Sequence, residues 1–183
     1  MRPIPSALMA PPMLTHFTRA SKSQSAIDNL RGILADGVIR STRRMVRSND
    51  PAVCFFDLRI SELEPLLARR NRRRYGPFGI ATERRYAFRL GARPVIYLPW
   101  REAREAVVQG ESWRVVSVDF DRIRPADWTF GRGWRMRGDL PLDPTRCAAL
   151  VESWRDADEV YEHFDGHPPC AGVIPLKELF RKS

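Results

Sequence analysis

The hydrophobic positions of this chain change between the two-residue spacing of strands and the three- to four-residue spacing of helices. The first spacing predicts strands at Met13–Thr18, Ala52–Phe56, Pro94–Leu98, Ser112–Phe120, Trp128–Arg135 and Gly172–Pro175, and a loop running into a strand over Tyr75–Thr82. The second predicts helices at Asp28–Asp36, Ile60–Arg70, Glu83–Leu90, Arg101–Val108 and Asp156–Phe164. The two kinds of element follow no strict strand–helix–strand rhythm, which favours an α+β fold over a doubly wound parallel sheet.

The expected elements belong to one domain. A chain of 183 residues is long enough for one domain with a proper core and short for two. No stretch rich in glycine or serine marks a boundary, so we expect residues 13–183 to form a single domain. Residues 1–12 are expected to be a flexible lead-in, because prolines interrupt their apolar positions. The same interruption makes them a poor match for a signal peptide.

Composition narrows the setting in which the protein works. No run of about 18 apolar residues is present, so no membrane partner is expected. The three cysteines (Cys54, Cys147 and Cys170) are widely spaced and form no CxxC pair, which disfavours a disulfide framework and favours a reducing, cytoplasmic location. Cys54 lies within an apolar strand pattern and is expected to be a buried small hydrophobe.

The net charge of +9 indicates a negatively charged partner, such as nucleic acid, a nucleotide or an acidic protein. The densest positive charge is the run of Arg69, Arg70, Arg72, Arg73 and Arg74, just before Tyr75 and Phe78. Arginines beside aromatic rings are suited to phosphate contact with base stacking, and could equally serve the pyrophosphate of a dinucleotide. The alternative is a solvated helix end, where cations favour the C-terminal dipole.

Several kinds of catalytic or metal site are disfavoured. Neither a P-loop nor a G-x-S-x-G nucleophile motif is present, and Asp119 with Asp121 lacks the further partner expected of a two-metal nuclease. His163 and His167 lie four apart, but Pro168 prevents a helix from holding both on one face, so we predict no metal site. His16 lies within the first predicted strand. The residues alone favour a half-buried histidine whose ring bonds a carbonyl group.

Four segments together resemble a known family. LTHFT, NLRGILADGVI, VCFFD and YGPFGIATERRYAFRLGARPVIYLP follow in order and are similar to the AbiGi-like abortive-infection proteins of phage resistance. The resemblance runs from about Leu14 to about Leu142, and its most specific parts are Y-G-x-[FY]-G-I-A and P-V-I-Y. The same order of elements is similar, more weakly, to the DNA-targeting ADP-ribosyltransferase toxins of the DarT type.

This resemblance implies an ADP-ribosyltransferase-like fold, in which two small sheets with flanking helices form a cleft that binds NAD. It implies that His16 and Thr18 contact the adenosine-side ribose, that Arg19 reaches a phosphate, and that Tyr75 or Phe78 stacks on nicotinamide. It further implies a defence protein or toxin that transfers ADP-ribose from NAD to nucleic acid or to an associated protein. A cognate antitoxin would be a further partner.

The chain departs from the family pattern where the family carries its late-strand glutamates. The family typically has D-W-T-x-Glu-Arg-Glu-Trp-Arg, whereas Gly131 and Gly133 stand at the two glutamate positions here. A glutamate there would orient the nicotinamide ribose and stabilise its cationic transition state. The sequence leaves open whether the glycines are natural or introduced, whether the protein is an inactivated transferase or a non-enzymatic nucleic-acid- or partner-binding module, and whether Glu111 substitutes.

Overall fold

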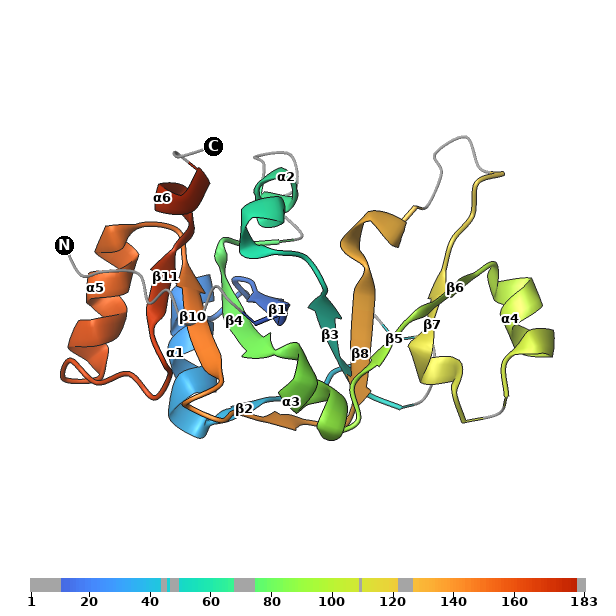
Figure 1. Cartoon of the computed structure of the whole chain (residues 1–183), viewed down its shortest axis with the longest axis horizontal. Coiled ribbons are helices and arrows are strands. Elements are labelled where there is room, and N and C mark those ends of the chain that lie inside the picture. Colours follow the sequence, from blue (N-terminus) through green and yellow to red (C-terminus); the bar gives the residue numbers. More distant parts are fainter. Residues whose placement is uncertain are drawn as a thin grey trace.

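The main body of the molecule is a seven-stranded mixed sheet with the order β11-β10-β4-β1-β3-β8-β5. The computed structural model shown in Figure 1 describes residues 11–43, 46, 50–67, 75–108, 110–121 and 127–180. The strands of this sheet are β1 (Met13–Thr18), β3 (Ala52–Phe56), β4 (Phe78–Glu83), β5 (Arg93–Pro94), β8 (Gly133–Arg137), β10 (Cys147–Val151) and β11 (Val173–Pro175). Two smaller sheets pair β2 (Val38–Ile39) with β9 (Leu140–Pro141), and β6 (Ile96–Leu98) with β7 (Val115–Ser117).

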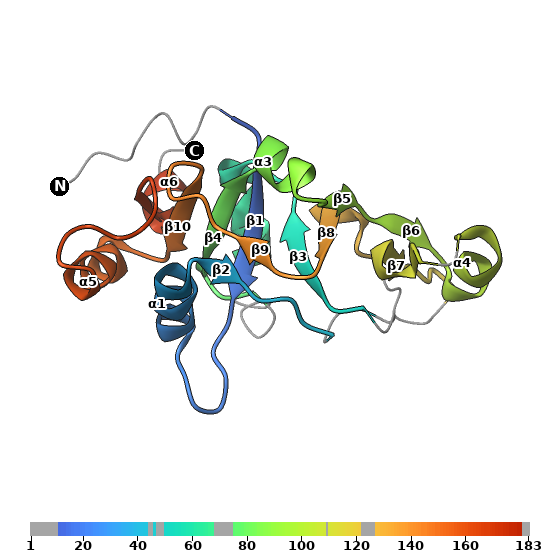
Figure 2. The same cartoon turned by 90° about the horizontal axis from the view of Figure 1, so that it is seen from below.

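Helices cover both faces of the sheet on the side of β10, β4 and β1 (Figures 1 and 2). Helices α1 (Ala26–Asp36) and α5 (Trp154–His163) pack against one face, which we call the α1 face. The short helices η2 (Ile60–Leu63), α2 (Glu64–Leu67) and α6 (Leu176–Phe180) pack against the other, the η2 face. The remaining helices of the described residues are α3 (Arg84–Arg89), α4 (Trp100–Ala106), η4 (Ser112–Arg114) and η5 (Thr129–Gly131).

Helix α1 is capped at both of its ends. Ser25 is the N-cap, and its hydroxyl accepts the Asp28 N–H while the Asp28 carboxylate returns to the Ser25 backbone, forming a capping box. The helix therefore begins two residues before the predicted Asp28. Gly37 ends it in the left-handed region at φ 63°, the conformation in which helices commonly end on glycine.

The sheet corrects our expectation of two small sheets that form a cleft. β1 pairs with β4 over six residue pairs and also with β3, so the two halves join into one seven-stranded sheet. The junction between β1 and β3, which we call the seam, has a single register pair, Thr15 with Phe56. The family resemblance implied two separate sheets, and at that place the structure has a weakly paired junction within one sheet.

The segment predicted as one strand over Pro94–Leu98 divides between two sheets. Arg93 and Pro94 pair with β8, whereas Ile96–Leu98 pair in parallel with β7. Proline lacks the N–H that would continue the ladder, and the chain leaves the main sheet directly after it. β6, α4, η4 and β7 together form what we call the β6–β7 lobe, at the right-hand end of the molecule in Figure 1.

Other predicted elements shift, and some were missed. The strand expected over Ser112–Phe120 is η4 followed by β7, and that over Trp128–Arg135 is η5 followed by β8. The sequence did not predict β2, β9, β10 or α6. β10 was missed because all five of its residues are buried, which removes the alternation that marks a strand. No helix among the described residues has the length and apolar character needed to span a membrane.

Candidate functional site

His16 lies at the seam, and its ring joins the two halves of the sheet. Its half-buried imidazole places Nδ1 2.9 Å from the Cys54 carbonyl oxygen, across the seam from β1. A carbonyl only accepts, so Nδ1 carries the proton and Nε2 is an acceptor in the neutral ring. Burial lowers the pKa of His16, which favours this neutral form. Cys54 itself is half-buried, not fully buried as predicted.

Thr18 and Arg19 follow at the end of β1, where the chain turns toward α1. The Thr18 hydroxyl donates to the Ala26 carbonyl at 2.9 Å, so it fixes the start of the helix. The Arg19 carbonyl accepts from the Asn29 side-chain amide at 2.7 Å. One guanidinium nitrogen of Arg19, Nη2, is buried without a hydrogen-bond partner among the described residues. A buried donor of this kind is costly unless a ligand or water accepts from it, so Arg19 could bind an anion.

The two candidate stacking residues lie on opposite faces of the sheet. Phe78 packs with the cluster of the α1 face, the face to which His16 also belongs through its edge-to-face contact with Phe55. Tyr75 belongs to the η2 face, where its ring lies edge-to-face with Phe56 at 5.1 Å and beside Phe17. A ligand that uses Tyr75 therefore approaches from the η2 face, and one that uses Phe78 from the α1 face.

Gly133 lies in the same cross-strand row of the sheet as β1. It pairs with Phe56, which in turn pairs with Thr15, so about 10 Å separates Gly133 from β1 at the usual strand spacing. Paired residues in antiparallel strands share a face, so position 133 belongs to the η2 face with Phe56, whereas His16 belongs to the α1 face. The fold thus brings His16 and Gly133 to one region but directs them to opposite faces. A ligand that contacts both must cross the seam.

Neighbouring side chains surround both glycines. A Cβ atom added to Gly131 would lie 2.7 Å from Cδ1 of Phe56, closer than real Cβ atoms come. A Cβ added to Gly133 would lie 3.1 Å from the Tyr97 hydroxyl and 3.2 Å from Val95. Position 131 therefore has no room for a side chain unless Phe56 moves, whereas position 133 needs only small shifts.

A polar network that sequence reasoning missed holds this segment in place. The Asp57 carboxylate, directly after β3, accepts from Arg84 at 3.0 and 3.2 Å and from the Trp134 indole at 3.1 Å. The Asp57 carbonyl accepts from Nε of Arg132 at 2.7 Å, and the Arg132 guanidinium also pairs with Glu62 at 2.7 Å. These contacts hold Arg132 at φ 43°, a left-handed conformation that is unusual outside glycine. A lone acid at the end of an apolar strand was the one sequence signal that could have drawn attention to Asp57.

Two other acids, Asp127 and Glu111, have structural roles. Asp127 accepts from the backbone and hydroxyl of Thr129 at 2.9 and 2.7 Å, which forms the turn that leads into η5. These hydrogen bonds lower the pKa of Asp127. Glu111, the candidate substitute for the missing glutamates, pairs with Arg114 at 2.9 Å on the β6–β7 lobe. Its carboxylate is thus already engaged by an arginine.

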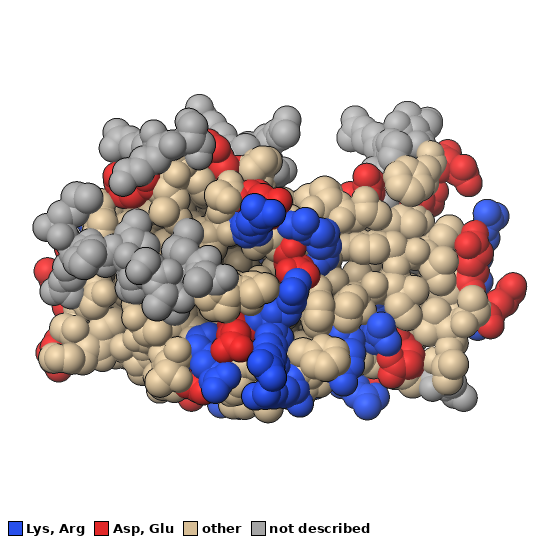
Figure 3. All heavy atoms as spheres, in the orientation of Figure 1, with Lys and Arg blue, Asp and Glu red and all other residues tan. Residues whose placement is uncertain are grey.

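The predicted arginine run, residues 69–74, lies outside the described residues. Leu67 and Tyr75, the described residues on either side of it, both pack on the η2 face. Figure 3 shows a second concentration of positive charge near the middle of the molecule, over α3 and its neighbours. Arg85 and Arg89 are exposed there without an ion-pair partner among the described residues, and Phe88 beside them is 47% exposed.

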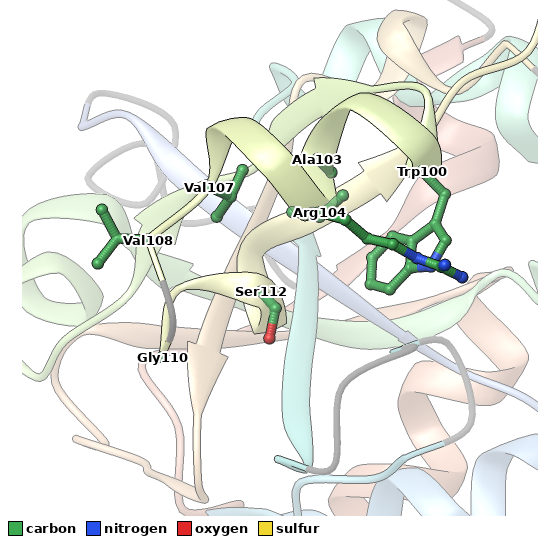
Figure 4. A pocket seen from close by; sticks show the side chains of 8 residues that line it. Trp100, Ala103, Arg104, Val107, Val108, Gly110 and Ser112 are labelled. Atoms are coloured by element: carbon green, nitrogen blue, oxygen red, sulfur yellow. The ribbon is translucent and has the colours of Figure 1, made fainter.

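A pocket of about 400 Å³ lies on the β6–β7 lobe, apart from the residues predicted for the site (Figure 4). Its apolar wall comes from α4 and β7, and Arg104 and Trp100 line the same space. The lining residues are Trp100, Ala103, Arg104, Val107, Val108, Gly110, Ser112 and Val115.

Comparison with solved structures identifies a protein of similar fold. The structure of DarT from Thermus sp. 2.9 in complex with carba-NAD+ aligns with 93% of this chain and 98% of its own, at 16% sequence identity and a TM-score of 0.50. No protein-family profile and no curated protein sequence matches the chain. The similarity shows a DarT-like α+β fold, whereas the resemblance to the AbiGi-like proteins stays a prediction.

Proposed function

We propose that this DarT-like fold binds NAD across the seam and that its ADP-ribosyltransferase chemistry is weak or absent because position 133 carries no acid. The observation that supports this proposal is a similarity in fold, over nearly the full length of both chains, to a DarT protein that holds an NAD analogue. His16 lies at the seam on the α1 face, and Gly133 lies on the η2 face about 10 Å from β1, so the dinucleotide would have to pass between β1 and β3 beyond their single register pair to contact both.

The residues at the seam are chemically suited to a dinucleotide. The Nε2 atom of neutral His16 can accept from a ribose hydroxyl, and the unpartnered Nη2 of Arg19 can donate to a phosphate oxygen. Tyr75, on the face of Gly133, is the better placed of the two stacking candidates for the nicotinamide end. Thr18 supports the site by fixing the start of α1.

The missing acid limits the chemistry. Transfer breaks the bond between nicotinamide and C1 of its ribose, the acceptor nucleophile forms the new bond to C1, and nicotinamide leaves with the bonding electron pair. Positive charge develops on the ribose during this step, and a nearby carboxylate would stabilise it. Glycine provides no such charge. We therefore propose NAD binding with little turnover. The proposed acceptor is nucleic acid or an associated protein, held by the exposed arginines of α3 together with the arginines of the 69–74 run.

A second candidate function is a non-enzymatic binding module, such as a sensor or antitoxin-like partner. It is favoured by the packing around the glycines, because the Phe56 ring occupies the space of a residue-131 side chain. Such a protein would keep the fold and its basic surface and would have no use for the carboxylates.

Titration calorimetry with NAD, paired with an assay for nicotinamide release, tests both candidates. We expect the wild type to bind NAD, and Gly133→Glu to gain nicotinamide release that the uncharged, equally large Gly133→Gln lacks. NAD binding without activity in Gly133→Glu would favour the binding module. Absence of affinity for NAD and ADP-ribose, both in the wild type and with both glycines changed to glutamate, would exclude the transferase proposal.

A further inference from the structure

The P-V-I-Y segment, one of the most specific parts of the family resemblance, ends on Tyr97, whose hydroxyl reaches the glycine segment. Tyr97 lies on β6 in the β6–β7 lobe, outside the main sheet. Its hydroxyl accepts the backbone N–H of Gly133 at 2.7 Å. Val95, two residues earlier, donates its own N–H to the Gly133 carbonyl at 3.0 Å. The lobe is therefore attached to position 133 from both sides of that residue.

The Tyr97 hydroxyl lies close to the position from which the side chain of an acid at residue 133 would extend. The hydroxyl oxygen is 3.1 Å from the Cβ position of residue 133. Ordinary bond lengths place the carboxylate oxygens of a glutamate about 3 to 4 Å from its own Cβ. The phenol oxygen thus lies within the shell that the carboxylate of a glutamate at this position would sample.

The Tyr97 hydroxyl can also donate a hydrogen bond. It acts as the acceptor toward Gly133, so its own proton remains available, and among the described residues no acceptor for that proton is found. Tyr97 is half-buried, so its side chain is not enclosed in the core. The charged groups that act on it are Arg135, which lowers its pKa, and Asp127, which raises it. Burial is the largest influence and raises the pKa of Tyr97, so the phenol is neutral at physiological pH.

We propose that Tyr97 is a ligand-binding residue of this site, whose hydroxyl takes the place of the missing carboxylate and donates a hydrogen bond to a ribose hydroxyl of the bound nucleotide. This inference rests on the proposed NAD binding. A neutral phenol can orient a ribose but supplies no negative charge, so Tyr97 supports binding and not bond cleavage. The β6–β7 lobe is then part of the nucleotide site.

The placement of the hydroxyl is tested without any nucleotide. The chain has four tyrosines, so ¹³Cζ labelling resolves each ring, and Tyr97→Phe identifies its signal. We expect the pKa of Tyr97 to be higher in Gly133→Glu than in Gly133→Gln by about one unit or more, because the carboxylate disfavours the phenolate. Equal pKa values in the two variants would overturn the placement. If the longer side chains prevent folding, the same comparison of Tyr97 pKa values is made between Gly133→Asp and Gly133→Asn.

The ribose contact is tested by NAD titration of the full chain. Loss of one hydrogen bond in Tyr97→Phe should weaken NAD binding about three- to tenfold. Tyr86→Phe is the matched control, because it also removes one tyrosine hydroxyl, which donates to the Pro141 carbonyl. The Tyr86→Phe variant should bind NAD with the affinity of the wild type. The loss in Tyr97→Phe should disappear with an NAD analogue that lacks the 2′-hydroxyl of the nicotinamide ribose.

Unchanged NAD affinity in Tyr97→Phe would overturn the ribose contact and leave the proposed function standing. A wild type that does not bind NAD would instead contradict the proposed function and the ribose contact together, while the tyrosine titration would still decide where the hydroxyl lies.

Discussion

The two halves of the sheet are stabilised in different ways. On the β10–β4–β1 side, the strands are buried on both faces, and Leu14, Ile80 and Leu150 are inaccessible to solvent. On the β3–β8–β5 side, much of the attachment is polar: buried Arg135 of β8 donates to the Trp113 and Val115 carbonyls of the lobe. The first half owes its stability to apolar burial, and the second also depends on side chains that bind backbone groups. The candidate site lies where the two halves meet.

The largest expected effect belongs to the apolar half. Leu150→Ala in β10 removes a fully buried side chain and should lower the free energy of unfolding by about 3 to 5 kcal/mol in urea denaturation. Leu150→Met, which keeps the volume, should cost less than about 1.5 kcal/mol. A cost for Leu150→Ala no greater than that of the polar variant Asp57→Asn would remove the contrast between the halves.

The next effect concerns the glycine beside Phe56. Gly131→Ala should lower the free energy of unfolding by about 1 to 3 kcal/mol, because its Cβ would lie 2.7 Å from the Phe56 ring. The cost should shrink when Phe56→Leu is present, and a double-mutant cycle measures that coupling. Gly133→Ala, whose nearest contact would be 3.1 Å, should cost less. Equal costs at the two positions would contradict the packing described around them.

A smaller effect is expected from the polar network. Asp57→Asn keeps the shape of the side chain but removes the charge that pairs with Arg84, and should lower the free energy of unfolding by about 1 kcal/mol. The pair is partly exposed, so solvent screening keeps this value small. Trp134→Phe, which removes the indole donor, should reduce the effect of Asp57→Asn in a double-mutant cycle. If the effects of Asp57→Asn and Trp134→Phe on the free energy of unfolding simply add, the carboxylate and the indole do not stabilise the protein through a shared contact.

The smallest effect is the contribution of His16 to the pH dependence of stability. Its pKa is lowered in the folded protein by burial, so the unfolded chain binds its proton more readily. Stability should therefore fall as pH drops below about 6.5, the ordinary value for histidine, and go on falling until the lowered folded-state pKa is passed. Urea denaturation between pH 5 and 8 measures this slope. His16→Gln should flatten it, and an unchanged slope would assign the dependence to other groups.

The sequence predicted the elements whose signals are local. Strands β1 and β3 have the predicted bounds, and α1 begins two residues before the predicted Asp28 and ends at the predicted Asp36. β10 was missed because complete burial leaves no polar positions to mark its faces. The segment around Val95 divides between two sheets because its two parts pair with different strands. Local sequence patterns do not show which strands pair.

The candidate site was predictable to a similar extent. His16 and Gly133 were singled out from motifs, and the fold places both in one sheet. Their assignment to opposite faces depends on the single register pair at the seam. The contacts of Asp57 and Tyr97 join residues 77 and 36 positions apart, and such distant contacts leave no local pattern.

Both outer strands of the main sheet are short and contain a proline. β11 ends at Pro175, and β5 consists of Arg93 and Pro94. Open strand edges are where β proteins add foreign strands and aggregate, and a residue without an N–H is a poor template for such growth. A highly charged chain with these blunted edges should remain monodisperse at concentrations where an exposed edge of equal length would promote fibril formation.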